Sequence, residues 1–349
     1  MPLKNTAKRL LKHAVIRTGL EAVALSRAGA LWPAAAGRGL IFTLHHVRPA
    51  REGRYDPNAL LSVTPEFLDQ AIRVCAESGL TPVALEDLPK LLADPNDTRR
   101  FVCFALDDGY RNNAEHAAPV FRSHGVPYTI FITRGFVERT SSMWWETAKA
   151  LTRKKSAFEF DFGNGRETMS TRSHGQKLAA FDRISRFVQT ADEDVAVARL
   201  DAVARSCLID PLAIVDQLTM DERALRDLSG DPLVRFGAHT LTHVNLRRVG
   251  EKRLAEEMAG SATAVEAYVG RAPQSFAYPY GFAAAAGERE FEAAAQAGFA
   301  VAVTTQPGVL TAETLAQRPT ALPRVSLNGL YQRPRYVRAL ISGIPFRFM

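Results

Sequence analysis

Apolar segments of strand length alternate with amphipathic helical segments along most of the chain. The predicted strands lie within residues 39–47, 99–109, 126–133, 232–243, 273–281 and 300–308, and the helices within 64–80, 113–125, 251–270 and 289–299. Apolar strands separated by helices predict a parallel sheet covered by helices. Polar residues follow several of the strands directly, where a (β/α) barrel gathers its active-site loops. We therefore expect an α/β protein, and its 349 residues suffice for one large domain with appendages or two small domains.

The basic charge of the chain is concentrated at its two ends. The formal net charge is +7, but residues 1–30 contribute +5 and residues 331–349 contribute +4, which leaves about −2 for the residues between them. This distribution argues against a nucleic-acid groove across the domain, and it favours ends that meet an anionic surface such as a phospholipid layer. The cysteines at positions 75, 103 and 207 are scattered, and they indicate neither a disulfide framework nor a paired metal site.

The N-terminal arm is basic and has helical periodicity, with Leu11, Val15 and Leu25 set against charged positions. Charges interrupt any signal-peptide core, and the arm lacks the run of about 20 apolar residues that a spanning helix needs. A helix packed on the domain and a helix lying in a membrane interface both remain open. We expect a cytoplasmic protein, peripheral to the inner membrane face.

Changes in composition divide the chain into three parts. They are a basic amphipathic arm (1–38), a barrel domain (39–330) with a charge-rich helical insertion over about 146–230, and a basic aromatic tail (331–349).

Two neighbouring carboxylates end one of the predicted strands. In FALDDGY, Asp107 and Asp108 follow an apolar run and Gly109 comes next. An Asx-turn with Gly109 at positive φ accounts for one aspartate and the glycine, but not for the second acid. If one aspartate bound a metal ion, the other could remove a proton from water as a general base.

A pair of histidines, His239 and His243, follows another predicted strand. Their i, i+4 spacing can converge on one metal ion from a helical or turned segment. A nearby aspartate would complete a site of two histidines and one carboxylate, with positions open for water and substrate. A polar loop with two solvated histidines is the alternative.

Three motifs together resemble the polysaccharide deacetylases (carbohydrate esterase family 4, the NodB-homology domain). FALDDGY resembles the family's T-F-D-D-G motif, HTLTH its H-[ST]-x-x-H motif, and FAYPYG its third motif, usually R-x-P-Y-G. The resemblance covers residues 101–282 in matching order. It implies a distorted (β/α) barrel that removes N- or O-acyl groups from amino sugars with a divalent metal ion, most often Zn²⁺, with Ni²⁺, Co²⁺ and Fe²⁺ as alternatives.

The resemblance also implies roles for the motif residues. Asp107 would be the general base, and Asp108 would bind the metal together with His239 and His243. The backbone N–H of Tyr280 would bind the oxyanion, a contact that can contribute about 3 kcal/mol.

The third motif is also expected to lie beside the substrate, through Tyr278 and Pro279, and Pro279 fixes the turn that aims the N–H of the next residue. The arginine of this motif, which orients the base in the family, is replaced by Ala277. Either another cation, for instance Arg324, takes its place, or the base is less restrained.

A second departure is the missing late histidine, because no histidine follows His243. GLIFTLHHV (39–47) resembles an early Y-H-x-V stretch in a permuted subgroup, typified by enzymes that de-N-acetylate β-1,6-linked poly-N-acetylglucosamine. On this alignment His45 is the general acid that protonates the departing amine. His46 would support the site or contact substrate; a buried core histidine is the alternative for this strand.

The aromatic segment MWWE (143–146) also recurs in that subgroup. It makes Trp145 a candidate for stacking on a sugar ring, with a core position as the alternative.

The sequence therefore predicts a metal-dependent hydrolase that removes an N-acetyl group from an amino sugar of a polysaccharide, oligosaccharide or lipid-linked saccharide. The expected partners are this carbohydrate and an anionic membrane, with no nucleic acid. The alternative is a non-catalytic glycan-binding module built on the same barrel. The lost arginine at Ala277 favours this alternative, and the complete Asp-Asp-His-His set opposes it.

Overall fold

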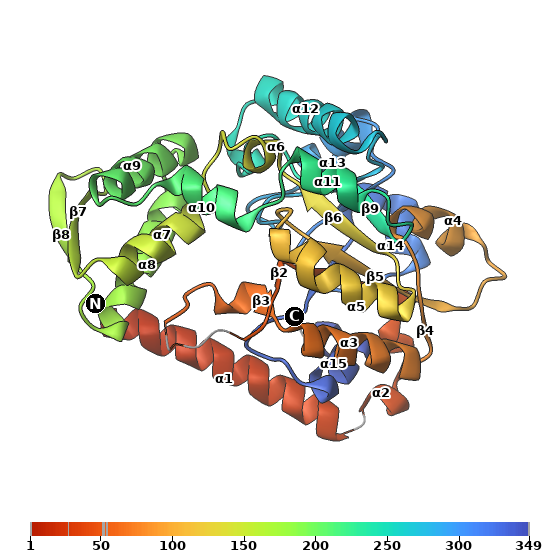
Figure 1. The fold of residues 1–349 in the computed structure, drawn as a ribbon. Helices are drawn as coiled ribbons and strands as arrows, with labels where there is room; N and C mark the ends of the chain where they lie inside the picture. The colour runs from red at the N-terminus through yellow and green to blue at the C-terminus, as the bar shows by residue number, and fades with distance from the viewer. Residues whose placement is uncertain (1, 27, 51–52, 54, 348–349) are drawn as a thin grey trace.

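A parallel sheet that curls into an incomplete barrel forms the centre of the molecule (Figure 1). The structure is a computed structural model that describes residues 2–26, 28–50, 53 and 55–347. The strands of the sheet are β1 (Gly39–Leu44), β4 (Leu80–Pro82), β5 (Arg100–Leu106), β6 (Tyr128–Ile132), β9 (Val234–Ala238), β10 (Ser275–Ala277), β11 (Val301–Val303) and β12 (Val325–Ser326).

Their order across the sheet is β11-β10-β9-β6-β5-β1-β12, with β4 paired to the first half of β5. All of these pairs are parallel. Just before β12, Leu322 bridges Val303 of β11, so the chain reaches back toward the opposite edge. The expected α/β class and distorted barrel are confirmed.

The side chains of β5 alternate between two apolar cores, as the period of a strand requires. Phe101, Cys103 and Ala105 point into the barrel, and the residues between them point to the outer core under the helices. Asp107 continues the inward series directly after the strand, and its side chain is buried. The register of the strand therefore aims the first aspartate of the doublet into the barrel.

The outer face of the sheet is covered by helices that the sequence predicted. They include α3 (Pro65–Glu77), α5 (Ala118–His124), α12 (Glu251–Val269) and α13 (Glu288–Gln296). At the start of α3, the Oγ1 atom of Thr64 accepts a hydrogen bond from Phe67 N (3.1 Å), with Pro65 in the first turn. Gly79 follows the helix with φ of 72°. Thr64 is therefore the N-cap of α3.

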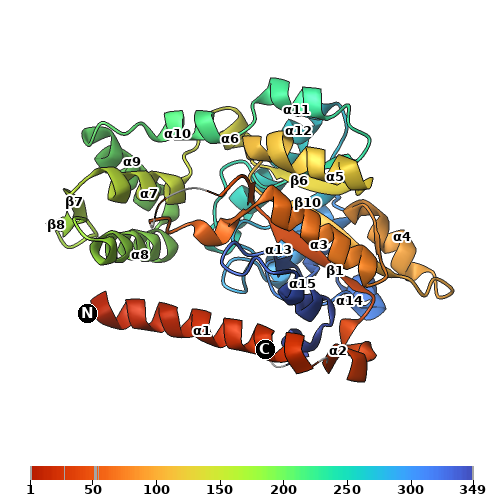
Figure 2. The same cartoon turned by 60° about the horizontal axis from the view of Figure 1, so that its bottom comes forward.

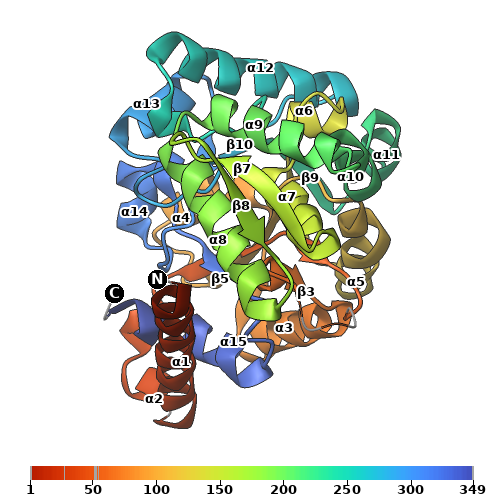
Figure 3. The same cartoon turned by 90° about the vertical axis from the view of Figure 1, so that its left-hand side faces the viewer.

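Residues 144–218 form a separate layer beside the barrel, shown in front of it in Figure 3. Its elements are α7 (Trp144–Lys154), β7 (Ala157–Asp161), β8 (Arg166–Ser170), α8 (His174–Thr190), α9 (Glu193–Ser206) and α10 (Pro211–Leu218). They enclose an apolar core of their own.

The prediction of an all-helical insertion is wrong for the β7–β8 hairpin. Its charged residues suggested a helix, but buried Phe158 and Phe160 alternate with exposed neighbours, which is the period of a strand.

The N-terminal and C-terminal helices lie side by side along one side of the molecule (Figure 2). Helix α1 (Pro2–Ser26) packs on α15 (Pro334–Ile341), where Leu20 is buried against Tyr336 and Ala339. Glu21 of α1 accepts hydrogen bonds from Arg335 (2.6 Å) and Tyr336 (2.5 Å). No helix within the described ranges is long and apolar enough to cross a membrane.

Candidate active site

The predicted site residues meet where four strands end. His45 follows β1, Asp107 and Asp108 follow β5, His239 follows β9, and the third motif follows β10. In the register of the sheet, the last residues of β1 and β5 lie side by side. His45 therefore lies next to Asp107, with 3.9 Å between His45 Nε2 and Asp107 Oδ2.

Asp108, His239 and His243 form a compact, buried cluster. The Nε2 atoms of His239 and His243 lie 3.5 and 3.4 Å from Oδ1 of Asp108. Ligand atoms around one tetrahedral zinc ion lie about 3.3 Å apart, because each is about 2.0–2.1 Å from the metal. Oδ1 of Asp108 is buried and has no hydrogen-bond partner in the described chain. One carboxylate oxygen and two ring nitrogens thus fit a divalent metal ion.

The histidine orientations support this fit. His239 Nδ1 lies 2.6 Å from the carbonyl oxygen of Ala277, so this nitrogen carries the proton and Nε2 is free to bind a metal. The segment between the histidines is a turn rather than a helix, because Thr240 and His243 have φ of 66° and 61°. Glu257 of α12 closes the turn by accepting from the backbone N–H groups of Leu241 and Thr242 (2.8 and 3.0 Å).

The aspartate doublet sits in a tight turn. Asp108 and Gly109 have φ of 73° and 64°, so the predicted positive φ of Gly109 is confirmed. Aspartate tolerates this left-handed conformation better than most residues. The turn directs Asp108 toward the histidines while Asp107 stays in line with β5. The side chains of Asp107 and Asp108 therefore have different partners although the residues are adjacent.

Asp107 is held by Arg324, which is fully buried. The guanidinium donates to both carboxylate oxygens, from Nη1 to Oδ1 at 2.7 Å and from Nη2 to Oδ2 at 2.8 Å. Its Nε donates to the carbonyl of Thr304 (2.7 Å). The cation expected to replace the arginine missing at Ala277 is therefore present, and it reaches the base from the segment before β12.

The electrostatics keep both aspartates ionised. Burial acts to raise the pKa of Asp107, but Arg324 together with His239 and His45 outweighs it, and the pKa falls below its usual value. Burial likewise opposes ionisation of Asp108, but His239 and His243 hold its pKa well below the usual range. Burial lowers the pKa of His45, while the charge of Asp107 acts in the opposite direction.

The third motif brings the ring of Tyr280 close to that of His243, with 5.1 Å between their centroids. Tyr280 has φ of 63°, and its N–H meets no hydrogen-bond acceptor in the part of the chain that the structure describes. Its hydroxyl donates to Oε1 of Glu193 at 2.5 Å and accepts from Trp144 Nε1 at 2.8 Å. Glu193 also accepts from the backbone N–H of Asn245 (2.9 Å). The insertion is thus joined to the strand-end loops.

The five side chains of the predicted substrate-binding set are buried: His46, Trp145, Tyr278, Pro279 and Arg324. Asp107, Asp108 and His239 are just as buried, and Trp145 lines a small cavity together with His243, so contact with substrate stays a prediction for these five.

Four of them also make contacts that hold them in the fold, and those of Arg324 are given above. Nδ1 of His46 accepts from Asn112 Nδ2 (2.9 Å), which places its ring in the core. Trp145 donates to the Tyr110 hydroxyl (3.0 Å), and its ring centroid lies 4.8 Å from that of His243. Tyr278 donates to the carbonyl of Thr320 (2.8 Å).

Several supporting residues were missed in the sequence. Asn112 and Asn113 follow the aspartate turn, and Asn113 Nδ2 donates to the carbonyl of His45 (2.7 Å). Two adjacent asparagines three and four residues after Gly109 were the available indication. Nothing local marks Glu257 or Glu193, because charged residues of helices usually face solvent.

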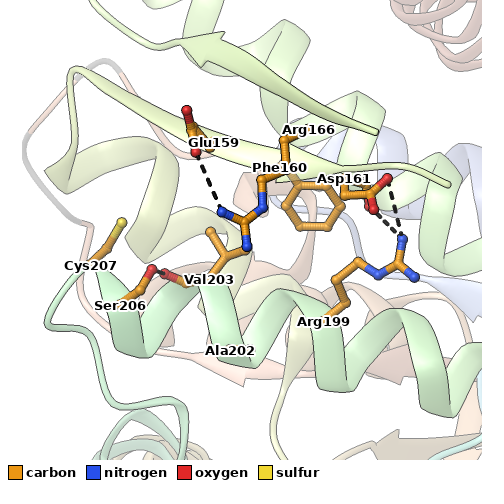
Figure 4. Close-up of a pocket in the computed structure, with 9 residues that line it drawn as sticks. All are labelled: Glu159, Phe160, Asp161, Arg166, Arg199, Ala202, Val203, Ser206 and Cys207. Carbon is orange, nitrogen blue, oxygen red and sulfur yellow. Dashed lines mark hydrogen bonds and ion pairs between the residues drawn. The ribbon is translucent and has the colours of Figure 1, made fainter. Parts of the chain in front are cut away.

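A cavity of about 530 Å³ lies on the insertion, between the β7–β8 hairpin and α9 (Figure 4). Its two arginines are paired, Arg166 with Glu159 (4.0 Å) and Arg199 with Asp161 (3.7 Å). None of the predicted site residues lines it.

Comparisons with known proteins agree with this geometry. Residues 197–302 match the family model described as polysaccharide deacetylase. The match includes HTLTH and the third motif but not the aspartate doublet. No curated protein matches the chain significantly.

Similar solved structures include the deacetylase PplD of Streptococcus pyogenes in complex with acetate (TM-score 0.54, 14% identity, covering 83% of this chain and 92% of PplD). Another is a polysaccharide deacetylase from Bacillus cereus (TM-score 0.53, 13% identity, 86% of this chain and 68% of the other). A third is IcaB from Ammonifex degensii (TM-score 0.50, 15% identity, 86% and 96%). At these identities the likeness establishes the fold.

Proposed function

We propose that this chain, which matches the polysaccharide deacetylase family model over residues 197–302, is a member of that family and a metal-dependent hydrolase that removes the N-acetyl group from an amino sugar of a glycan. The observation that carries the proposal is the buried Asp108–His239–His243 cluster with a second, arginine-bound aspartate beside it. A purely structural turn would have no use for two ionised acids with separate partners.

The cluster would hold a divalent ion, and two imidazoles with one carboxylate suit Zn²⁺. Such an ion would polarise the acyl carbonyl and lower the pKa of a bound water toward about 7. Asp107, ionised and fixed by Arg324, accepts the proton of the attacking water. The C–N bond of the amide then breaks, and acetate and a free amine are released.

Two further groups complete the proposed reaction. The N–H of Tyr280 donates to the oxyanion that forms as water adds to the carbonyl. His45 protonates the departing amine. Its position beside Asp107 supports this role, because the general acid and the general base then lie next to the same scissile amide. This early histidine also supports placement in the subgroup that acts on poly-N-acetylglucosamine.

The proposed substrate is a membrane-proximal or lipid-linked saccharide, and the proposed location is the inner face of an anionic membrane. Exposed apolar residues on α1 and the basic charge of both chain ends support this. We also retain the proposed division into arm (1–38), barrel (39–330) and tail (331–349).

A screen of N-acetylated amino sugars tests the function. The purified protein is incubated with N-acetylglucosamine oligomers and lipid-linked N-acetylated saccharides, and released amine and acetate are measured together with metal content. We expect acetate release that a chelator abolishes and added Zn²⁺ restores. A metal-loaded protein that binds glycan and releases no acetate would instead be a binding module. The missing arginine at Ala277 favoured this alternative, but Arg324 supplies a cation that binds Asp107.

A further inference from the structure

We propose that a basic cavity next to the candidate active site binds a phosphate group carried by the substrate; this inference rests on the proposed deacetylase function. The cavity has a volume of about 650 Å³ and lies among the segment after β2 (His46–Val47), the helices α7 and α8, and residues 329–332. Its cationic lining residues are Arg48, Lys149, Arg153 and Lys177.

The lining is strongly unbalanced in charge. Among the described residues of the lining, Asp56 supplies the one carboxylate against four cations. Lys149 Nζ lies 3.0 Å from Oδ1 of Asp56 and 3.4 Å from Oε2 of Glu146. Glu146 lies behind the wall of the cavity. When its charge is included, the four cations still outnumber the two carboxylates, and a bound anion would neutralise the excess positive charge.

Two of the cations are built into the wall rather than displayed on the surface. The side chains of Arg48 and Lys149 belong to residues that are only 6% and 5% exposed. Arg48 Nη2 donates to Ser62 Oγ (2.7 Å), which fixes the guanidinium. Burying a cation is costly unless it is paired, and here Asp56 and Glu146 pair with Lys149 while Asp56 also lies 3.7 Å from Nη2 of Arg48. Two carboxylates thus balance the two buried cations, and the excess positive charge of the lining is carried by the two cations nearer the opening.

Arg153 and Lys177 form the outer rim. Lys177 Nζ donates to the carbonyl of Arg153 (3.1 Å), which holds its ammonium at the opening. Arg153 is exposed and leaves its guanidinium available for bidentate contact. A phosphate entering the cavity would thus meet rim cations first and the buried Lys149 at its base.

The cavity is close enough to the site to share one substrate with it. Arg48 is three residues after His45, so their Cα atoms are within about 10 Å of each other. His46, between them, faces Glu146 across 3.8 Å, and Glu146 in turn contacts Lys149. A saccharide with its N-acetyl group at Asp107 could therefore place a phosphate among the four cations.

A phosphate ester is the chemistry that this lining fits, because Arg and Lys together satisfy its charge and oxygen acceptors. A neutral oligosaccharide could accept hydrogen bonds from these four cations but would not neutralise their charge. The phosphate could belong to a lipid carrier or to a water-soluble sugar phosphate. The cavity in Figure 4 serves as a comparison. Each of its two arginines is paired with a carboxylate, so its lining carries no excess charge.

The test uses the full chain, the variants Arg153→Gln and Lys177→Gln, and Arg199→Gln from the other cavity as a matched control. Deacetylation is measured on three substrates: a neutral N-acetylglucosamine trimer, N-acetylglucosamine 1-phosphate, and polyprenyl-diphosphate-linked N-acetylglucosamine in micelles. Each rim variant should raise KM about ten-fold on a phosphorylated substrate, since a hydrogen bond to a charged group contributes about 1.5–3 kcal/mol. Turnover of the trimer and the behaviour of Arg199→Gln should not change.

The three substrates distinguish the possible outcomes. An effect on both phosphorylated substrates assigns a phosphate site open to either source, and an effect on the lipid-linked substrate alone assigns the carrier phosphate. Equal KM changes on the neutral trimer would overturn the proposal. If no substrate is turned over, the deacetylase function fails, and calorimetry with inorganic pyrophosphate decides the cavity by itself. Binding by the wild type that is weakened about ten-fold in the rim variants supports the site, and absence of binding refutes it.

Discussion

Asp107 and Asp108 are adjacent and chemically identical, yet the fold gives them different partners. Asp108 faces two histidines, whereas both oxygens of Asp107 are bound by Arg324. Asp107→Asn should therefore lower kcat by about 10²–10⁴-fold, the usual contribution of a general base, and leave the metal content unchanged. His243→Ala should lose the metal as well as the activity. Kinetics and elemental analysis on the same samples check this, and full activity of the asparagine variant would refute the assignment of the base.

The buried Asp107–Arg324 pair also affects the stability of the fold. Removing one partner of such a pair leaves an uncompensated buried charge, which costs about 3–5 kcal/mol. Arg324→Ala should lose this much unfolding free energy in chemical denaturation, whereas Arg226→Ala should change it by less than about 1 kcal/mol, because Arg226 pairs with Glu222 on the exposed surface. Arg324→Lys keeps a charge but not the two-pronged contact, so it should fold and show a reduced kcat. A stable Arg324→Ala protein with normal kcat would show that the base needs no orientation.

At the scale of elements, the insertion takes part in the candidate site through α9. Glu193 at the start of that helix holds the hydroxyl of Tyr280, whose N–H we assign to the oxyanion. Glu193→Ala and Tyr280→Phe should each lower kcat by about ten-fold with KM and metal content preserved. Because they remove the same hydrogen bond, the double variant should be no slower than either single one. Additive losses in this double-mutant cycle would mean that the two residues act independently.

Some features of the fold and the candidate site could be predicted from the sequence, and others could not. The strand that carries Asp107 is apolar and local in sequence, so its period already aims that residue into the barrel, and the turn at Gly109 follows from local chemistry. Arg324 was suspected because the family pattern left a charge unmatched at Ala277. The contact of Glu193 with Tyr280 joins residues 87 positions apart and leaves no local pattern. The sequence left both a sugar-stacking and a core position open for Trp145, since composition does not distinguish a sugar-binding aromatic from one that packs behind a histidine.

At the scale of the whole molecule, the two ends of the chain carry its net positive charge and expose apolar residues of α1. Helix α1 buries Leu20 against α15, while Leu11, Val15 and Leu25 on its other side are 65%, 63% and 77% exposed. An interfacial helix binds through such apolar area together with attraction to anionic lipid. The full-length protein should float with vesicles that contain phosphatidylglycerol, less with neutral phosphatidylcholine, and less at high salt.

Replacing these three residues together by serine should abolish flotation. Leu208→Ser provides the matched control, because this leucine is 92% exposed on the insertion and should not affect binding to vesicles. Light scattering of the same samples separates a membrane surface from a contact between copies of the chain. If the wild type is a dimer that the triple variant disrupts, and neither protein floats, then the face of α1 is a subunit interface and the membrane assignment is refuted.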